Sequence, residues 1–100
     1  MPVKDFDFNL LKVLDALIAE RNVTRAGRRL RRSQPAVSNS LHRLRTLLGD
    51  ELLVRGSSGL VLTRRAEALR DPLREAIALV DDCLFQEESF DPARATGVYR

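Results

Sequence analysis

The sequence of 100 residues has one cysteine, no tryptophan and only five aromatic residues, and each of these shortages argues against particular classes of function. Cys83 alone cannot form an intramolecular disulfide or a cysteine zinc cluster, which favours a reducing cytoplasm. Few aromatic rings leave little surface on which unpaired bases could stack. No apolar run reaches eighteen residues, and the acidic N-terminus lacks the pattern of a signal peptide, so neither a transmembrane span nor a leader is expected.

Residues that carry enzymatic chemistry are also scarce. The chain has no glycine-rich phosphate loop, no nucleophile elbow and no acid pair at a catalytic spacing. Its single histidine, His42, has no second histidine or suitably spaced acid, so neither a metal site nor a catalytic role is expected. We therefore expect no enzyme, no metal and no cofactor. The length, with 44% hydrophobic and 31% charged residues, fits one small folded domain.

Charge is distributed unevenly along the chain, although the net charge is only +3. Residues 1–20 carry −2, residues 21–74 carry +9 and residues 75–100 carry −4. Residues 21–45 contain eight arginines and no acid, and fifteen of the seventeen basic residues are arginine. The planar guanidinium suits phosphates and guanine edges, so this block is typical of a polyanion-binding surface. Charge alone leaves a solvated arginine-rich face as an equal alternative.

The first third of the chain predicts two helices. Asp7 is a suitable N-cap for a first helix that runs to about Glu20, with apolar residues on one face at helical spacing. Asn22 tolerates a left-handed backbone and is expected to end this helix. Thr24 is expected to cap a second helix over residues 25–31, which is too short to be stable without tertiary packing.

A third helix is predicted to begin after the cap residue Ser33, with Pro35 in its first turn, and to stop at Gly49. Its apolar stripe consists of Val37, Leu41, Leu44 and Leu48. The opposite face carries small or polar groups that can donate and accept hydrogen bonds, namely Gln34, Ser38, Asn39, His42 and Arg45.

A hairpin and a long helix are predicted to follow. Residues 52–55 and 60–62 are β-prone and are separated by a Gly-Ser-Ser-Gly turn. Thr63 is a suitable cap for a helix over about 64–86. Apolar residues repeat along this helix at spacings of four and three, which favours a dimer interface over intrachain core. The predicted interface residues are Leu69, Leu73, Ala76, Ile77, Val80, Cys83 and Leu84.

Together these elements predict a mainly α winged helix-turn-helix of three helices and a β-hairpin wing, followed by a long dimerisation linker helix. A helix fits the major groove of B-DNA, and side chains near its N-terminus reach base edges. The candidate base contacts are Gln34, Pro35, Ser38 and Asn39. Candidate contacts to the DNA backbone are Thr24, Arg25, Arg28, Arg32, Arg43, Arg55, Ser57, Ser58, Arg64 and Arg65.

Several of these assignments have plainer alternatives. Thr24 and Ser33 are expected to act as helix caps whatever the function. Two roles are evenly balanced for Arg43, contact with phosphate and bracing of the fold. A protein-interaction module is the rival from another functional class. In that module the basic block would bind an acidic partner, and the long helix would join a heteromeric coiled coil.

The stretch from Ser33 to Leu41, SQPAVSNSL, resembles the LysR-type transcriptional regulators. The likeness covers nearly the whole chain, from Asp7 to about Phe90. Its Pro-Ala-Val-Ser-Asn and Arg-Ala-Glu-Ala-Leu segments are most similar to the nodulation and aromatic-catabolism regulators of that family. Further matching segments are Leu44-Arg45, Leu48-Gly49-Asp50, Leu53-Val54-Arg55, Leu62-Thr63 and Arg65 to Leu69.

The resemblance implies a bacterial transcription factor built in three parts. Residues 1–63 would form the DNA-binding domain, residues 64–88 the linker helix, and residues 89–100 a hinge toward an absent effector-binding domain. By position, the family's base-contacting residues fall on Gln34, Pro35 and Ser38, with Asn39 and His42 nearby. Its phosphate-contacting helix starts fall on Thr24 and Ser33, and its wing arginine falls on Arg55.

The resemblance also implies partners and a location. The expected partners are double-stranded DNA with a dyad-symmetric site, a second copy of the chain, and a small-molecule effector in the full-length protein only. The expected location is the bacterial cytoplasm, at the nucleoid. Two positions depart from the family pattern, because Arg64 replaces a usual proline and Gly27 replaces a frequent alanine.

Overall fold

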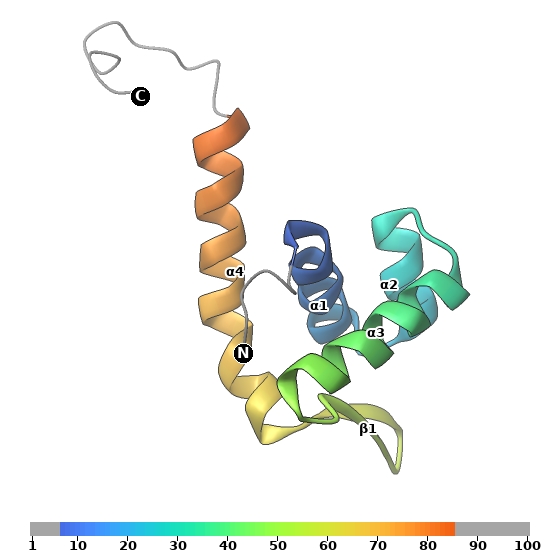
Figure 1. The fold of residues 1–100 in the computed structure, drawn as a ribbon. Helices are drawn as coiled ribbons and strands as arrows, with labels where there is room; N and C mark the ends of the chain where they lie inside the picture. Colours follow the sequence, from blue (N-terminus) through green and yellow to red (C-terminus); the bar gives the residue numbers. More distant parts are fainter. Residues whose placement is uncertain (1–6, 86–100) are drawn as a thin grey trace, which may run out of the picture.

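The computed structural model describes residues 7–85, which form four helices and one two-stranded antiparallel hairpin (Figure 1). This is the mainly helical winged architecture that the sequence predicts. In chain order the elements are α1 (Phe8–Glu20), α2 (Val23–Leu30), α3 (Gln34–Leu48), β1 (Leu53–Gly56), β2 (Gly59–Leu62) and α4 (Arg64–Phe85).

Helix α1 begins as predicted, but the connection to α2 differs from the prediction. The Asp7 carboxylate accepts the Leu10 amide proton at 2.7 Å and caps α1. Arg21, not Asn22, takes the left-handed conformation that ends α1, with a φ of 51°. Asn22 is extended and caps α2 by accepting the Arg25 amide proton at 2.8 Å. The predicted cap Thr24 therefore lies inside α2, which begins at Val23 and ends at Leu30.

Helix α3 has the ends that the sequence predicts. The Ser33 hydroxyl accepts the Ala36 amide proton at 3.2 Å, and Pro35 occupies the first turn, where no amide donor is needed. Gly49 ends the helix at a φ of 65°, and its amide donates to the Arg45 carbonyl at 2.8 Å.

The hairpin pairs Leu53 with Leu62 and Gly56 with Gly59, so Ser57 and Ser58 form a two-residue turn. The prediction of a hairpin is confirmed, but its first strand begins one residue later than expected. Leu52 lies outside the strand because its φ is 67°, which is unusual for a branched side chain. This backbone turn allows both Leu52 and Leu53 to be buried.

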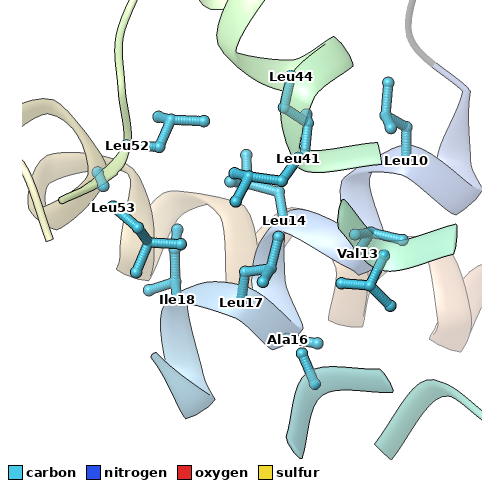
Figure 2. Close-up of a cluster of buried hydrophobic side chains, with 13 residues drawn as sticks. Leu10, Val13, Leu14, Ala16, Leu17, Ile18, Leu41, Leu44, Leu52 and Leu53 are labelled. Atoms are coloured by element: carbon cyan, nitrogen blue, oxygen red, sulfur yellow. The ribbon is translucent and has the colours of Figure 1, made fainter. Parts of the chain in front are cut away.

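The hydrophobic core is built around α1, whose buried side chains face α3 and the start of the wing (Figure 2). Leu17 and Ile18 of α1 pack in the same cluster as Leu44 of α3. Leu52 and Leu53 bring the base of the hairpin into this cluster. The core therefore fixes α3 and the wing on one scaffold.

Helix α4 begins where Thr63 accepts the Ala66 amide proton at 3.2 Å, as predicted. It continues through Pro72 to Phe85. Residues 86–88 of the predicted linker helix and the whole predicted hinge, residues 89–100, lie outside the described residues. The last turns of α4 extend past α1 (Figure 1). No helix among residues 7–85 combines the length and the apolar character that a membrane span needs.

Candidate nucleic-acid interface

The turn between α2 and α3 is tight because α2 contains a glycine at the point of closest approach. The Arg32 amide donates to the Gly27 carbonyl at 2.8 Å, and Arg31 takes a left-handed φ of 60°. A Cβ atom on Gly27 would lie 2.8 Å from the Arg32 carbonyl oxygen. Gly27 therefore allows the chain to fold back closely and sets the start of α3 against α2.

Helix α3 divides cleanly into a buried face and an exposed face. Val37, Leu41 and Leu44 are buried against the rest of the domain. All five predicted base-contacting residues are exposed, and they follow one another at helical spacing: Gln34, Pro35, Ser38, Asn39 and His42. No hydrogen bond to another residue of the described part of the chain occupies their side chains. Their donors and acceptors are therefore available to a ligand that lies along α3.

The predicted backbone-contacting residues are exposed, but their guanidinium groups fall into two sets. Within residues 7–85, no acid or carbonyl engages the guanidinium groups of Arg28, Arg43, Arg55 and Arg64. The other three are already bonded inside the chain. Arg25 lies 3.5 Å from the Glu20 carboxylate, Arg32 donates to the Asn9 side chain, and Arg65 donates to the Leu48 carbonyl at 2.9 Å.

The four hydroxyl residues predicted to contact DNA are exposed as well. Thr24 lies in the first turn of α2, and Ser33 directly precedes α3. Ser57 and Ser58 form the tip of the wing. The first turns of α2 and α3 and the wing tip thus present polar groups beside the exposed arginines, which is the composition that phosphate contacts require.

Two arrangements of arginines near α2, α3 and the wing were not predicted from the sequence. Glu20 at the end of α1 lies 3.5 Å from Arg25 and 3.3 Å from Arg29, so it faces two arginines of α2 at once. Arg45 was placed on the polar face of α3 and instead turns to the wing. It donates to the Glu51 carbonyl at 2.7 Å and to the Leu53 carbonyl at 2.8 Å.

Asp50 connects α3, the wing and α4. Its carboxylate accepts the Thr63 hydroxyl proton at 2.6 Å and the Leu52 amide proton at 2.8 Å. These two hydrogen bonds, the Thr63 bond first, hold the pKa of Asp50 below the 3.8 typical of aspartate, with a smaller contribution from the positive charge of Arg65. The ionised carboxylate is thus the form that this junction stabilises.

The seven residues predicted to form the dimer seam lie in two environments. Leu69 and Leu73 pack against the core of their own chain, and Ile77 is only 9% exposed. The other four, Ala76, Val80, Cys83 and Leu84, are exposed. Leu84 and its neighbour Phe85 are 62% and 67% exposed, which is unusual for large apolar side chains. The unpartnered part of the seam therefore lies in the last three turns of α4.

Three helices, a hairpin wing and an exposed polar face on α3 define a winged helix-turn-helix domain. The model of the bacterial regulatory helix-turn-helix proteins of the lysR family matches residues 8–67, and the chain belongs to this family. This confirms the resemblance to LysR-type regulators and the expectation of a regulator instead of an enzyme.

The most similar proteins include several nodulation proteins D of Bradyrhizobium. The chain is 45% identical over 100 residues to nodulation protein D 1 of Bradyrhizobium sp. (strain NC92), covering all of this chain and 32% of that protein. It therefore spans about a third of the length of the curated relatives that it matches.

Solved structures have the same fold. A probable transcriptional regulator of Pseudomonas aeruginosa, PA0477, superposes with a TM-score of 0.79 at 38% identity, over 90% of this chain and 30% of that one. The CbnR DNA-binding domain, solved as a DNA complex, superposes with a TM-score of 0.69 at 30% identity, over 90% of this chain and 97% of that one.

Proposed function

We propose that this chain binds double-stranded DNA in a sequence-specific manner, as a homodimer, and is the DNA-binding part of a bacterial transcriptional regulator. One observation carries the proposal. The face of α3 that carries Gln34, Ser38 and Asn39 is exposed and has no internal hydrogen-bond partner in the described chain, and exposed arginines lie on the same helix (Arg43), on α2 (Arg28) and on β1 (Arg55). The CbnR domain, which shares this fold, was solved on DNA, and this supports the same ligand here.

Helix α3 would enter the major groove and read base edges. The Gln34 amide can bond an adenine through two hydrogen bonds, and Asn39 can do the same. Ser38 can bond a base or a phosphate, and Pro35 offers apolar contact to a thymine methyl group. His42, one turn after Ser38, would meet the same groove further along the helix. These five residues would supply discrimination between sequences.

Arginines on both sides of α3 would supply affinity through phosphates. Arg28, Arg43, Arg55 and Arg64 have no partner within residues 7–85 and could bind phosphate without breaking an existing contact. Arg25 would have to leave Glu20, but an exposed ion pair of this kind contributes only about 0–1 kcal/mol. Arg32 and Arg65 would contribute mainly charge, together with the hydroxyl groups of Thr24, Ser33, Ser57 and Ser58 and the helix N-termini.

The homodimer would form through α4. Its exposed apolar residues are sufficient in number to pair with a second copy, namely Ala76, Leu79, Val80, Cys83 and Leu84. Leu69, Leu73 and Ile77 pack within the chain and would support the inner side of this helix. Two α3 helices held apart by paired α4 helices would enter successive major grooves of a dyad-symmetric site.

We propose that the chain is organised in three parts. Residues 1–63 would bind DNA, residues 64–88 would dimerise, and residues 89–100 would lead to a domain that binds a small-molecule effector. The greater length of the curated relatives supports such a further domain. A regulator of this kind would act in the bacterial cytoplasm at the nucleoid.

Selection of bound duplexes from a randomised pool, at two salt concentrations, tests the proposal. An enriched motif with an interrupted dyad is the expected result, and it would identify the half-site. Enrichment without a motif that disappears at the higher salt would mean that the arginines bind only the backbone. Binding to an acidic protein in place of DNA would favour the protein-interaction module.

A further inference from the structure

We propose that Arg45 is a positioning residue of the DNA-binding surface, which holds the wing, and with it Arg55, at a fixed place relative to α3. The inference rests on the proposed DNA binding. It differs from the assignment of arginines to phosphates, because Arg45 would act through the backbone of the wing and not through contact with DNA.

The guanidinium of Arg45 binds two backbone carbonyls of the segment that leads from α3 into the wing. Its Nε donates to the Glu51 carbonyl at 2.7 Å and its Nη2 donates to the Leu53 carbonyl at 2.8 Å. Residues 51–53 form a tight turn, in which Leu52 has a φ of 67° and the Leu53 amide donates to the Glu51 carbonyl at 2.6 Å, and one planar guanidinium reaches the carbonyls at both ends of this turn. The Glu51 carboxylate lies 3.5 Å from Nε and adds an ion pair.

The bonded edge is the one that β2 leaves open. The Thr63 amide donates to the Leu52 carbonyl at 2.9 Å, so one hydrogen bond joins Leu52 and Thr63 at the base of the hairpin, while the Leu52 amide donates to Asp50. In an antiparallel ladder bonded and non-bonded pairs alternate, so the next pair, Leu53 and Leu62, is non-bonded. The Leu53 carbonyl therefore points away from β2, where Arg45 is its partner.

This contact determines how firmly the wing is attached. A hairpin of two strands is at best marginally stable by itself. Beyond Leu53 the described strands carry exposed or half-buried side chains; Leu60 and Leu62 of β2 pack against the core, but in β1 only Leu53 is buried in it. Arg45 adds a rigid attachment from α3 at the last buried residue of β1. Arg55 lies two residues further along the same strand, and its position relative to α3 depends on this attachment.

Arg70 on α4 provides a matched control for Arg45. The side chain of Arg45 is 35% exposed, and two of its N–H donors are used inside the chain. The side chain of Arg70 is 41% exposed, and its guanidinium lies 3.9 Å from the Glu67 carboxylate and 3.6 Å from the Asp71 carboxylate. Arg70 carries the same charge, is not among the proposed DNA contacts and has its partners on α4, so Arg70→Lys controls for the change of side chain alone.

The test compares Arg45→Lys and Arg70→Lys, each with and without Arg55→Ala, in the 100-residue chain. Lysine retains the positive charge but lacks the planar guanidinium that reaches both carbonyls. The measurement is affinity for a random-sequence duplex as a function of salt concentration. We expect Arg45→Lys to weaken binding by the same factor as Arg55→Ala, with a salt slope shallower by about 0.9 for the lost phosphate contact. The Arg45→Lys and Arg55→Ala double variant should be no weaker than either single variant, whereas Arg70→Lys should bind almost as well as the parent.

Additive losses from Arg45→Lys and Arg55→Ala, or full affinity of Arg45→Lys, would overturn the inference.

A second readout needs no DNA. Amide ¹⁵N relaxation should show faster wing motion at Val54–Leu60 in Arg45→Lys, with α1 and α3 unchanged; an equally rigid wing would also overturn it. Failure of the parent chain to bind any duplex would refute the proposed function, and the relaxation result would still decide the role of Arg45.

If Arg45→Lys does not fold, a measurement on the parent chain tests the role of Arg45. The Nε proton of Arg45 should exchange slowly with solvent in the absence of DNA and remain protected when the duplex is added, because its partner is the Glu51 carbonyl. Rapid exchange without DNA, or protection that appears only with DNA, would identify Arg45 as a phosphate contact and overturn the inference.

Discussion

The Asp50 carboxylate accepts the hydroxyl proton of Thr63 at 2.6 Å, and this bond joins the end of α3 to the start of α4. The same carboxylate oxygen accepts the amide proton of Leu52, whose left-handed backbone brings the wing into the core. The Thr63 hydroxyl oxygen in turn accepts the Ala66 amide proton and caps α4. One carboxylate thus holds together the three elements that would meet at the DNA surface.

We predict that this junction makes stability dependent on pH in the acid range. The pKa of Asp50 is lowered in the folded chain, so its ionised form stabilises the fold above the pKa of the unfolded chain, near 3.8. That stabilisation is lost as the pH falls through the lower folded-state pKa. Asp50→Asn keeps the shape of the side chain and removes the charge, so it should be less stable than the parent at neutral pH.

Urea unfolding of both chains between about pH 7 and pH 3 checks this prediction. The difference in free energy of unfolding should stay constant at neutral pH and shrink below about pH 4. In a Thr63→Val background the difference should be smaller at every pH, because the largest cause of the lowered pKa is gone. A difference that does not change with pH would contradict the assignment.

Most of the fold could be predicted because its signals are local. Helices begin after Asp7, Ser33 and Thr63, whose side-chain oxygens accept amide protons of the first turn. Helix α3 ends at Gly49, which has no side chain to oppose a left-handed backbone. The turn between α1 and α2 could not be predicted in the same way, because two cap residues, Asn22 and Thr24, compete within three positions. The packing of α1 against α2, and the left-handed turn at Arg21, decide in favour of Asn22.

The tight turn before α3 leads to a second prediction. Gly27→Val should lower the free energy of unfolding by about 1–3 kcal/mol, because its Cβ would lie 2.8 Å from the Arg32 carbonyl oxygen and its methyl groups would crowd Val37. Thr24→Val in the same helix is a suitable control, since it adds a valine at an exposed position. Chemical denaturation measures both, and equal losses would show that helix propensity, not the close approach, determines the effect.

The site could be predicted only where residue type marks function. The polar face of α3 and the exposed arginines followed from side-chain chemistry and helical spacing. The role of Arg45 did not, because its partners are backbone carbonyls that no residue type reveals. The apolar spacing of α4 likewise could not tell which residues face the chain's own core. Leu69, Leu73 and Ile77 do so because α1 lies beside them.

The exposed end of α4 provides a third prediction, on assembly. Leu84→Asp should convert the proposed homodimer to a monomer, because a charge would be buried in the interface. The folded domain should keep its stability, since Leu84 is 62% exposed within the chain. Ala78→Asp, on another face of the same helix, adds the same charge and should leave the dimer intact. Light scattering over a range of concentrations measures the mass, and a dimeric Leu84→Asp would exclude this residue from the interface.

The last prediction separates base reading from phosphate binding at the two ends of the proposed surface. Gln34→Ala should relax the preference for one base pair in each half-site by about 1–3 kcal/mol, because its amide is exposed at the start of α3 and can bond adenine twice. Arg55→Ala should instead weaken all duplexes by a similar factor and reduce the salt dependence. Competition binding with a duplex from the pool selection and its single-base variants measures both effects. An unchanged preference in Gln34→Ala would remove Gln34 from the reading residues, and a loss confined to one sequence in Arg55→Ala would make the wing a reader of bases.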